Sequence, residues 1–407
     1  MSVLIWNSAI ASLFSISLFI SLLSSILLAV PALFFLIETL ASRRPPRPAF
    51  IPLRAKRVAI LMPAHDEAET IEGTLTELMA SLDEGMTIWV VADNCSDATA
   101  HLASELGARV VVRDDPSRHG KGYAIERGLE AMSDAPPDVV VILDADCHID
   151  ALSLRRIADI AHHKGRPAQA IYTMEPSAGS LVSRLGAFAF AVRNIVRPMG
   201  MKRLGLPVHL TGTGMAFPYA LLRASRGLDG RLVEDLYLGI ELSLGGRAPI
   251  LVEEARVESA LPLKGEAALE QRARWEGGSL GMMRSHLIKI LRDALRYRRP
   301  ALLGLALDLI IPPLALFAVL ISLGLVLALI ASVEMGSFLA LAIAALPALA
   351  LTAGIIIAYR AVGAPYLRVS ELLRAPLYML WKIPLYLGLM MRGAPKRWRR
   401  TERGRAE

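Results

Sequence analysis

Three long apolar segments constrain the fold of this chain more than any other feature. They cover residues 10–40, 301–331 and 338–359, and the first contains no charged residue except Glu38. About 20 apolar residues suffice for a helix to cross a bilayer, and a helix satisfies its own backbone hydrogen bonds there. Hydrophobic residues make up 54% of the 407 residues, which is high for a soluble protein. We therefore expect one membrane-spanning helix before a soluble region and two after it, with a kink or break at Pro312 and Pro313.

Positive charge lies beside these segments. The net charge is +7, and the basic residues concentrate at positions 43–44, 292–299 and 396–400. Because Lys and Arg flank membrane spans on the cytoplasmic side, we expect the soluble region in the cytoplasm. The loop 332–337 contains neither residue and is expected outside. This distribution indicates membrane-flanking charge and not nucleic-acid binding. The only two cysteines, Cys95 and Cys147, fit a reducing compartment without a disulfide framework.

A fourth apolar segment, residues 375–391, does not fit a simple span. It is short, it contains Lys382 and two prolines, and basic residues flank both of its ends. A segment with two cytoplasmic flanks cannot cross the bilayer, so we expect an interfacial or re-entrant helix there.

The soluble region begins with alternating strand and helix patterns. Apolar runs predict strands at residues 58–62, 87–92, 109–112 and 139–143, and helices are predicted between them at 67–81, 97–106 and 121–132. This alternation indicates an α/β fold with a doubly wound, mostly parallel sheet. Further along, helices are predicted at 149–164, 178–196, 233–244 and 267–277, and a glycine-rich turn at 211–214 leads into a short apolar stretch.

Acidic residues follow the predicted strands. Glu67 follows the first strand, Asp93 ends the second, and Asp144 and Asp146 follow the buried run 139–143. Ligands of open α/β sheets bind at this carboxyl edge. Two clustered carboxylates favour a hard cation, Mg²⁺ or Mn²⁺, which can hold a diphosphate. For any single motif a solvated loop is the simpler interpretation, but three acidic motifs on one edge favour a site.

Two later patterns allow both a functional and a structural interpretation. Glu234 and Asp235 can supply a general base, or they can stabilise a helix N-terminus through its dipole. Gln271, Arg274 and Trp275 share one face of a helix. They can contact a diphosphate and a sugar, or Trp275 can anchor an interfacial helix at the bilayer surface.

The order of these motifs resembles membrane-bound family 2 glycosyltransferases, the branch that includes cellulose, hyaluronan and chitin synthases. The resemblance covers roughly residues 58–278. It rests on Pro63-x-x-x-Glu67, Asp93, Gly120-Lys121-Gly122, Asp144-x-Asp146, Glu234-Asp235 and Gln271-x-x-Arg274-Trp275. The sequence departs from the family at Val233, where Thr is usual, and at His65-Asp66, where Tyr-Asn is common. The implied fold is GT-A.

The resemblance implies a role for each motif. The nucleotide would be held by Pro63, Glu67, Asp93, Lys121 and Asp144, and the donor's metal by Asp146 together with Asp144. Asp235, next to Glu234, would be the general base. The diphosphate and the acceptor would lie near Gln271, Arg274 and Trp275 and near the loop Gly212-Thr213-Gly214.

These observations predict an inner-membrane enzyme with a cytoplasmic catalytic domain. The expected order is a transmembrane helix (1–42), a linker (43–56), the GT-A domain (57–278), an interfacial helix (279–300), a membrane region (301–391) and a basic tail (392–407). We expect inverting transfer from a nucleotide-sugar, expected to be a UDP-sugar, with Mg²⁺ or Mn²⁺, to a lipid-linked saccharide or a growing exopolysaccharide. The alternatives are a processive synthase that secretes its homopolymer, and an inactive scaffold that assembles with envelope-polysaccharide partners.

Overall fold

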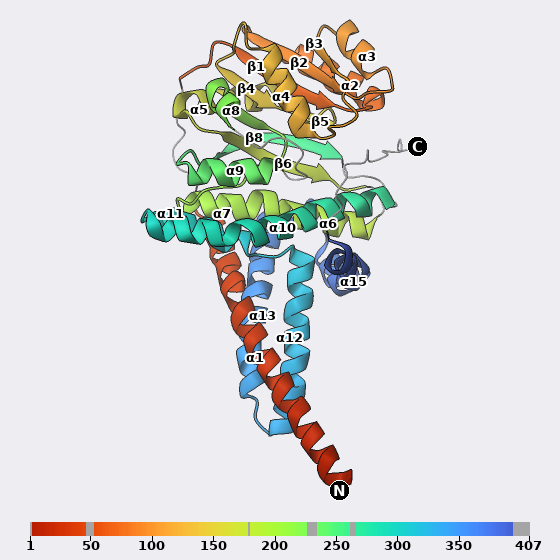
Figure 1. Cartoon of the computed structure of the whole chain (residues 1–407), viewed down its shortest axis with the longest axis vertical. Helices are drawn as coiled ribbons and strands as arrows, with labels where there is room; N and C mark the ends of the chain where they lie inside the picture. Colours follow the sequence, from red (N-terminus) through yellow and green to blue (C-terminus); the bar gives the residue numbers. More distant parts are fainter. Residues whose placement is uncertain (1, 46–52, 178–179, 226–233, 261–265, 394–407) are drawn as a thin grey trace.

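The chain forms three layers stacked along its long axis (Figure 1). The computed structural model describes residues 2–45, 53–177, 180–225, 234–260 and 266–393. A sheet with its covering helices lies at one end, a layer of helices runs across the middle, and a bundle of three long helices forms the other end. The sheet has eight strands in the order β3-β2-β1-β4-β7-β6-β8-β5.

The half of the sheet farther from the three-helix bundle is the parallel fold that the sequence predicts (Figure 1). Its strands are β1 (Val58–Ala64), β2 (Met86–Asp93), β3 (Arg109–Arg113) and β4 (Val139–Ile142). All of these pair in parallel, and the intervening helices are α2 (Ala68–Ala80), α3 (Thr99–Glu105) and α4 (Lys121–Ala131). Ile60 of β1 pairs with Ile88 and Val141 on its two sides. Such continuous apolar runs are typical of strands buried on both faces.

The other half of the sheet is mixed. It contains β7 (Met215–Pro218), β6 (Ala168–Glu175), β8 (Ile250–Ala260) and β5 (Cys147–Ile149). β7 is antiparallel to β4 and β6, β8 is parallel to β6, and β5 is antiparallel to β8. The sequence analysis did not predict β5, β6 or β8, because strand preference depends strongly on the neighbouring strands. The helix predicted at 149–164 is α5 (Ala151–Lys164), which Asp150 caps by accepting the Ser153 N–H at 2.9 Å.

Two predicted helices differ in their bounds from the helices of the middle layer. The segment predicted as one helix at 178–196 is α6 (Leu181–Ala191) followed by a π-helical turn, η1 (Val192–Val196), and α7 (Arg197–Arg203). The helix predicted at 267–277 and the interfacial helix at 279–300 are instead one continuous helix, α10 (Glu266–Arg296). A glycine costs only about 1 kcal/mol inside a helix, and Gly277 and Gly278 are both buried there. α8 (Tyr219–Ala224) and α9 (Glu234–Leu244) lie nearer the sheet. Ala178 and Val233, the first residues of two predicted helices, lie outside the described residues.

Three helices in the described part of the chain are long and apolar enough to cross a membrane. They are Leu18–Ser42 within α1 (Ser2–Ser42), Leu314–Met335 (α12) and Leu339–Gly363, which is α13 (Leu339–Ala358) with the π-helical η2 (Tyr359–Gly363). The count of three confirms the prediction, but the second segment differs from the expected 301–331. It is divided into the short α11 (Pro300–Leu309) and α12, because Pro312 and Pro313 lack N–H groups to continue the helix. Residues 332–335, expected in the loop, belong to α12.

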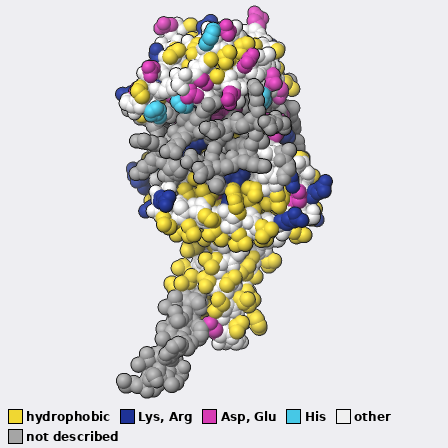
Figure 2. Space-filling model, turned by 90° about the vertical axis from the view of Figure 1, so that its right-hand side faces the viewer, with side chains coloured by type: hydrophobic (Ala, Val, Ile, Leu, Met, Phe, Trp, Pro, Cys, Tyr) yellow, Lys and Arg dark blue, Asp and Glu magenta, His cyan; other side chains and the backbone are white. Residues whose placement is uncertain are grey.

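The segment predicted as interfacial forms α15 (Ala375–Arg392), preceded by the one-turn α14 (Val369–Leu372). α15 is seen nearly end-on in Figure 1, so it runs across the direction of α12 and lies below α6. Hydrophobic side chains cover the three-helix bundle, and Lys and Arg gather where the bundle meets the wider body of the molecule (Figure 2). This pattern is typical of a helix bundle that crosses a membrane, with basic residues at the membrane boundary. The basic tail from residue 394 onward lies outside the described residues.

Candidate functional site

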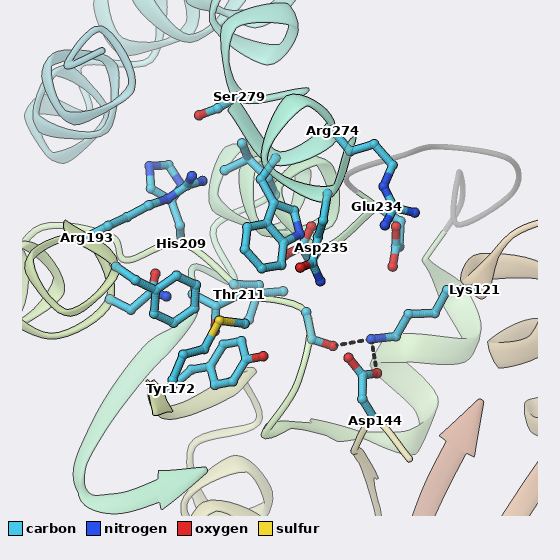
Figure 3. A pocket seen from close by; sticks show the side chains of 18 of the residues that line it. Lys121, Asp144, Tyr172, Arg193, His209, Thr211, Glu234, Asp235, Arg274 and Ser279 are labelled. Carbon is cyan, nitrogen blue, oxygen red and sulfur yellow. Dashed lines mark hydrogen bonds and ion pairs between the residues drawn. The ribbon is translucent and has the colours of Figure 1, made fainter. Parts of the chain in front are cut away.

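A cavity of about 360 Å³ lies between the carboxyl edge of the sheet and the middle helix layer. It brings together residues from β1, β2, α4, α9 and α10, which are far apart in the sequence. Figure 3 shows part of its lining. The predicted site residues that line it are Pro63, Glu67, Asp93, Lys121, Asp144, Asp146, Gly212, Glu234, Asp235, Gln271, Arg274 and Trp275. The other two, Thr213 and Gly214, lie behind the lining and shape the adjacent turn.

Lys121 connects the two halves of the sheet. It is the first residue of α4, and its ammonium group forms an ion pair with Asp144 and donates a hydrogen bond to the Gly212 carbonyl at 2.6 Å (Figure 3). Burial lowers the pKa of Lys121, but Asp144 and the pair Glu234 and Asp235 raise it more, so the net pKa lies above its usual value. Lys121 therefore stays charged and contributes one cation to a strongly acidic site.

Asp144 and Asp146 form a possible metal site. Their carboxylate oxygens and the Cys147 sulfur all lie within 4.8 Å of one another. Burial raises the pKa of the Cys147 thiol, and the neighbouring Asp146 adds to the shift. The two carboxylates match the oxygen preference of Mg²⁺ and Mn²⁺.

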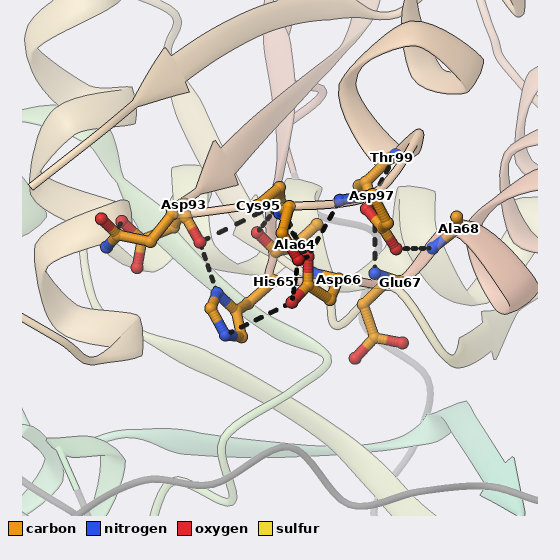
Figure 4. Close-up of polar contacts among 11 residues, drawn as sticks. Ala64, His65, Asp66, Glu67, Ala68, Asp93, Cys95, Asp97 and Thr99 are labelled. Atoms are coloured by element: carbon orange, nitrogen blue, oxygen red, sulfur yellow. Dashed lines mark hydrogen bonds and ion pairs between the residues drawn. The ribbon is translucent and has the colours of Figure 1, made fainter. Parts of the chain in front are cut away.

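The loops after β1 and β2 are fixed to each other by polar contacts (Figure 4). The Asp66 carboxylate accepts the Ser96 N–H at 2.6 Å, and the His65 ring contacts the Asp93 carbonyl at 2.6 Å. Asp66 and Asn94 both adopt left-handed backbone conformations, with φ of 53° and 50°. Asn and Asp tolerate this region better than other residues with a side chain. The Asp93 carboxylate forms an ion pair with Arg113, which holds it at the edge of the cavity.

The glycine-rich turn 211–214 depends on close packing. Gly212 and Gly214 have positive φ angles of 90° and 61°. A Cβ atom on Gly212 would lie 3.4 Å from the Asp235 carboxylate, and one on Gly214 would lie 2.7 Å from Val257. The buried Gln169 holds this turn by accepting the Thr211 N–H and donating to the Thr213 carbonyl, both at 2.9 Å. The Thr213 hydroxyl in turn accepts the Asp144 N–H at 3.1 Å. The sequence analysis did not identify Gln169, because its partners are about 40 residues away.

Glu234 and Asp235 start α9 and face the cavity. Burial and the adjacent Asp235 raise the pKa of Glu234 to about 7. Burial also raises the pKa of Asp235 above its usual value, while Lys121 and Arg193 oppose the shift. A carboxylate with a raised pKa binds a proton more readily, which is the property of a general base.

The face of α10 that carries Gln271, Arg274 and Trp275 closes the cavity opposite the sheet. The Trp275 ring lies 5.9 Å from the Phe190 ring of α6, measured between centroids. Trp275 also packs against the core of the sheet domain. These contacts place Trp275 in the cavity wall.

The cavity also contains residues that the sequence analysis missed. Arg197 forms ion pairs with Asp308 at 2.6 Å and with Glu38 of α1 at 3.3 Å, and His209 lies 2.6 Å from Asp308. Arg193 of η1 lines the cavity near this cluster. Glu38 was visible as the one charge in an apolar segment, but its partners belong to elements more than 150 residues away.

Comparisons with known proteins identify the family of the catalytic region. The family model described as "Glycosyltransferase like family 2" matches residues 55–278, which is more than half of the chain. The glycosyltransferase AglD of Haloferax volcanii is 31% identical over 125 residues, which cover 28% of this chain and 19% of the relative. An uncharacterized glycosyltransferase of Mycobacterium tuberculosis is 27% identical over 206 residues, covering 47% of this chain and 86% of the relative. The chain thus spans less than a fifth of the archaeal relative.

One solved structure resembles most of the chain. A mannosyltransferase from Pyrobaculum calidifontis, in complex with GDP-Man and Mn²⁺, aligns with a TM-score of 0.56 and 19% identity. The alignment covers 89% of this chain and 99% of the other. At this identity the likeness establishes a shared fold, the GT-A glycosyltransferase fold. The fold, the arrangement of the acidic motifs and the family match lead to one conclusion: the chain belongs to glycosyltransferase family 2.

Proposed function

We propose that this protein is an inverting membrane glycosyltransferase that moves a sugar from a nucleotide-sugar to a lipid-linked saccharide or a growing exopolysaccharide. The single observation that supports this best is the cavity itself. It places the acidic pair Asp144 and Asp146 on one wall and the raised-pKa pair Glu234 and Asp235 on another, with Lys121 between them.

The donor would lie at the carboxyl edge of the parallel strands. Asp146 and Asp144 would hold Mg²⁺ or Mn²⁺, which supplies charge neutralisation for the diphosphate. The presence of Mn²⁺ and GDP-Man in the mannosyltransferase structure supports a divalent cation and a nucleotide-sugar. Pro63, Glu67 and Asp93 lie at the same edge and would contact the nucleoside. Lys121 and Arg274 are the cations in the cavity wall that can stabilise the leaving diphosphate.

The transfer would be a single displacement. Asp235 takes the proton of the acceptor hydroxyl, the hydroxyl oxygen bonds to the anomeric carbon, and the bond between that carbon and the diphosphate breaks. The nucleoside diphosphate leaves with the electron pair, and the anomeric configuration inverts. Asp235 suits this role because burial favours its protonated form after the transfer.

The acceptor would approach from the side of the membrane helices. The cavity wall includes Ile311 and Pro313 at the break between α11 and α12, directly before a candidate span. With the soluble domain in the cytoplasm, this position lies at the inner face of the cytoplasmic membrane.

The direct test is donor screening with purified protein in detergent. UDP- and GDP-sugars would be offered with Mg²⁺ or Mn²⁺. Release of the nucleoside diphosphate would be measured, and the glycosylated product would be identified by mass spectrometry. Asp146→Asn should remove the activity, whereas the matched change Asp134→Asn at an exposed position should not. Absence of nucleotide release with every donor and metal would favour the inactive scaffold instead.

A further inference from the structure

A second cavity, of about 100 Å³, adjoins the catalytic cavity on its membrane side. The two share lining residues that include Arg193, Arg197 and Trp275. The second cavity is enclosed by α6, η1 and α10 from the middle layer and by α12 and α15 from below. The helices that line it meet where the middle layer joins the three-helix bundle (Figure 1).

The membrane side of this second cavity is formed by helices that can cross the bilayer. Phe35 belongs to the span in α1, and Leu314 and Ala315 begin the span in α12. A molecule that occupies the second cavity would thus have apolar helices on one side and the catalytic cavity on the other. This is the position that a membrane amphiphile requires.

Positive charge dominates the polar lining of the second cavity. Four cationic side chains line it, Arg193, Arg197, Arg272 and Lys382, against one carboxylate, Glu276. Lys382 forms an ion pair with Glu276, and Arg197 is paired with Asp308 and Glu38.

The other two guanidinium groups have no hydrogen-bond or ion-pair partner among the described residues. Arg193 is exposed, and it projects from the π-helical turn η1. Such turns interrupt α-helices frequently at functional sites. Arg272 lies against the backbone of Gly186, where a Cβ atom would come within 2.8 Å of its Nη2 atom, and its guanidinium is 5.6 Å from the centre of the Trp381 ring. Gly186 thus leaves the space that the Arg272 guanidinium occupies.

Two unpaired guanidinium groups beside one cavity favour an anion. Arg presents a planar set of donors that matches phosphate oxygens, and such charge-assisted hydrogen bonds are the strong ones. Near a bilayer, positive side chains are commonly neutralised by anionic lipid headgroups. In the view of Figure 3, Arg193 lies on one side of Asp235, and Lys121 and Asp144 lie on the other.

We propose that the second cavity binds the phosphate headgroup of a membrane lipid that carries the acceptor. The phosphate would contact Arg193 and Arg272, the apolar chain would leave along α12 and α15 into the bilayer, and the acceptor hydroxyl would reach Asp235 through the shared wall. This inference rests on the proposed function, because it names the class of acceptor: a lipid-borne phosphate and not a free polymer chain.

The test is lipid binding to the full-length protein in detergent, measured by native mass spectrometry. The probe is dioleoyl phosphatidic acid, and dioleoylglycerol provides the same chains without the phosphate. We expect the wild type to retain phosphatidic acid and not dioleoylglycerol. Arg272→Gln and the double change with Arg193→Gln should each weaken retention by about tenfold or more, the loss expected when a charge-assisted donor is removed.

Two further variants separate a built site from general attraction. Arg360→Gln removes an exposed Arg in the last turn of the candidate span Leu339–Gly363 that lines neither cavity, and it should leave retention unchanged. Gly186→Ala keeps every charge but crowds the Arg272 guanidinium, and it should weaken retention. Equal retention in all variants, or equal binding of dioleoylglycerol, would overturn the proposal. Displacement by an equal concentration of inorganic phosphate would overturn it too, by indicating a site for the free ion.

The proposed function is tested separately on the same preparation. Nucleotide release by the wild type without added lipid reports donor cleavage alone. Release without specific retention of phosphatidic acid would leave the glycosyltransferase proposal intact and reject the lipid site.

Discussion

The two halves of the sheet differ in how their site residues are positioned. In the parallel half, Asp93 ends β2 and Asp144 lies two residues after the end of β4, so the direction of these parallel strands brings both to the same edge of the sheet. In the mixed half, the groups on the proposed acceptor side depend on contacts across long sequence distances. Gln169 holds the turn that carries Gly212, and Arg197 is fixed by residues of α1 and α11.

This difference suggests that the proposed donor site and the proposed acceptor side depend on different parts of the fold. The parallel half can form its proposed donor site from its own strands and loops, through contacts such as those in Figure 4. The proposed acceptor side depends on α1 and α11, because Glu38 of α1 and Asp308 of α11 form ion pairs with Arg197 in the cavity wall. Substitutions in the parallel half should therefore affect the transfer rate and donor binding. Substitutions on the other side should also affect the packing of the sheet domain against α1 and α11, and so the stability of the protein.

The largest effect is expected at the boundary of the two halves, from Asp235→Asn. Loss of a positioned base costs about 10²–10⁴ in rate, while the donor contacts remain. Steady-state transfer rates and equilibrium binding of the nucleotide-sugar should be measured on the same protein. A fall in donor affinity as large as the fall in rate would make Asp235 a donor-binding residue. It would then belong with the proposed donor site of the parallel half.

The pH profile of the wild type provides the control for this assignment. A base works when deprotonated, so activity should fall as pH decreases through the pKa of Asp235. Because burial raises this pKa, the decline should begin at higher pH than for a free Asp with a pKa of 3.8. The charged groups that tune it are Lys121, Arg193 and Glu234.

Asp146→Asn tests the parallel half. An amide is a weaker ligand for a hard cation than a carboxylate, and the loss of several kcal/mol of charge stabilisation corresponds to about 10³-fold in rate. Transfer should be measured over a range of Mg²⁺ and Mn²⁺ concentrations. Near-normal activity at saturating metal would show that Asp146 does not hold the cation.

Arg197→Met tests whether the membrane helices support the acceptor side. It removes the cation that pairs with both buried carboxylates, Glu38 and Asp308, and leaves His209 as the remaining partner of Asp308, and breaking a buried pair typically costs about 3–5 kcal/mol. The melting temperature in detergent should fall by several degrees, whereas Arg360→Met at an exposed site should have little effect. An unchanged melting temperature would mean that the two regions are not coupled through this cluster.

Trp275→Ala, at a residue that lines both cavities, is expected to lower the rate of transfer by a smaller factor. Loss of aromatic contacts worth about 0.5–1.5 kcal/mol corresponds to a decrease in transfer of about 2–10-fold. Specific activity per folded molecule should be compared with the yield of inserted protein. Reduced yield with unchanged specific activity would make Trp275 an interfacial anchor.

The topology prediction is tested with single cysteine substitutions, which are expected to change activity and stability least. Ser337→Cys should react with a membrane-impermeant maleimide in intact cells, because the turn between α12 and α13 is expected outside. Arg43→Cys, Arg299→Cys and Arg392→Cys should react only after the cells are opened, and the wild type with Cys95 and Cys147 provides the background. Labelling of Arg392→Cys from outside would make α15 a true span. The wall of the second cavity that α15 forms would then lie within the bilayer and not at its surface.

The sequence alone determined the elements whose signals are local. The strands of the parallel half are apolar runs bounded by turns, the membrane helices are long apolar segments, and the proline pair marks where α11 and α12 separate. Tertiary structure decided the rest. Strands β5, β6 and β8 exist because of pairing with distant partners, and α10 continues through two glycines because its neighbours bury them. The partners of Glu38 and the unpaired Arg193 and Arg272 emerge only when the sheet domain is packed onto its membrane helices. Burial and long-range electrostatics depend on that packing, which no short stretch of sequence encodes.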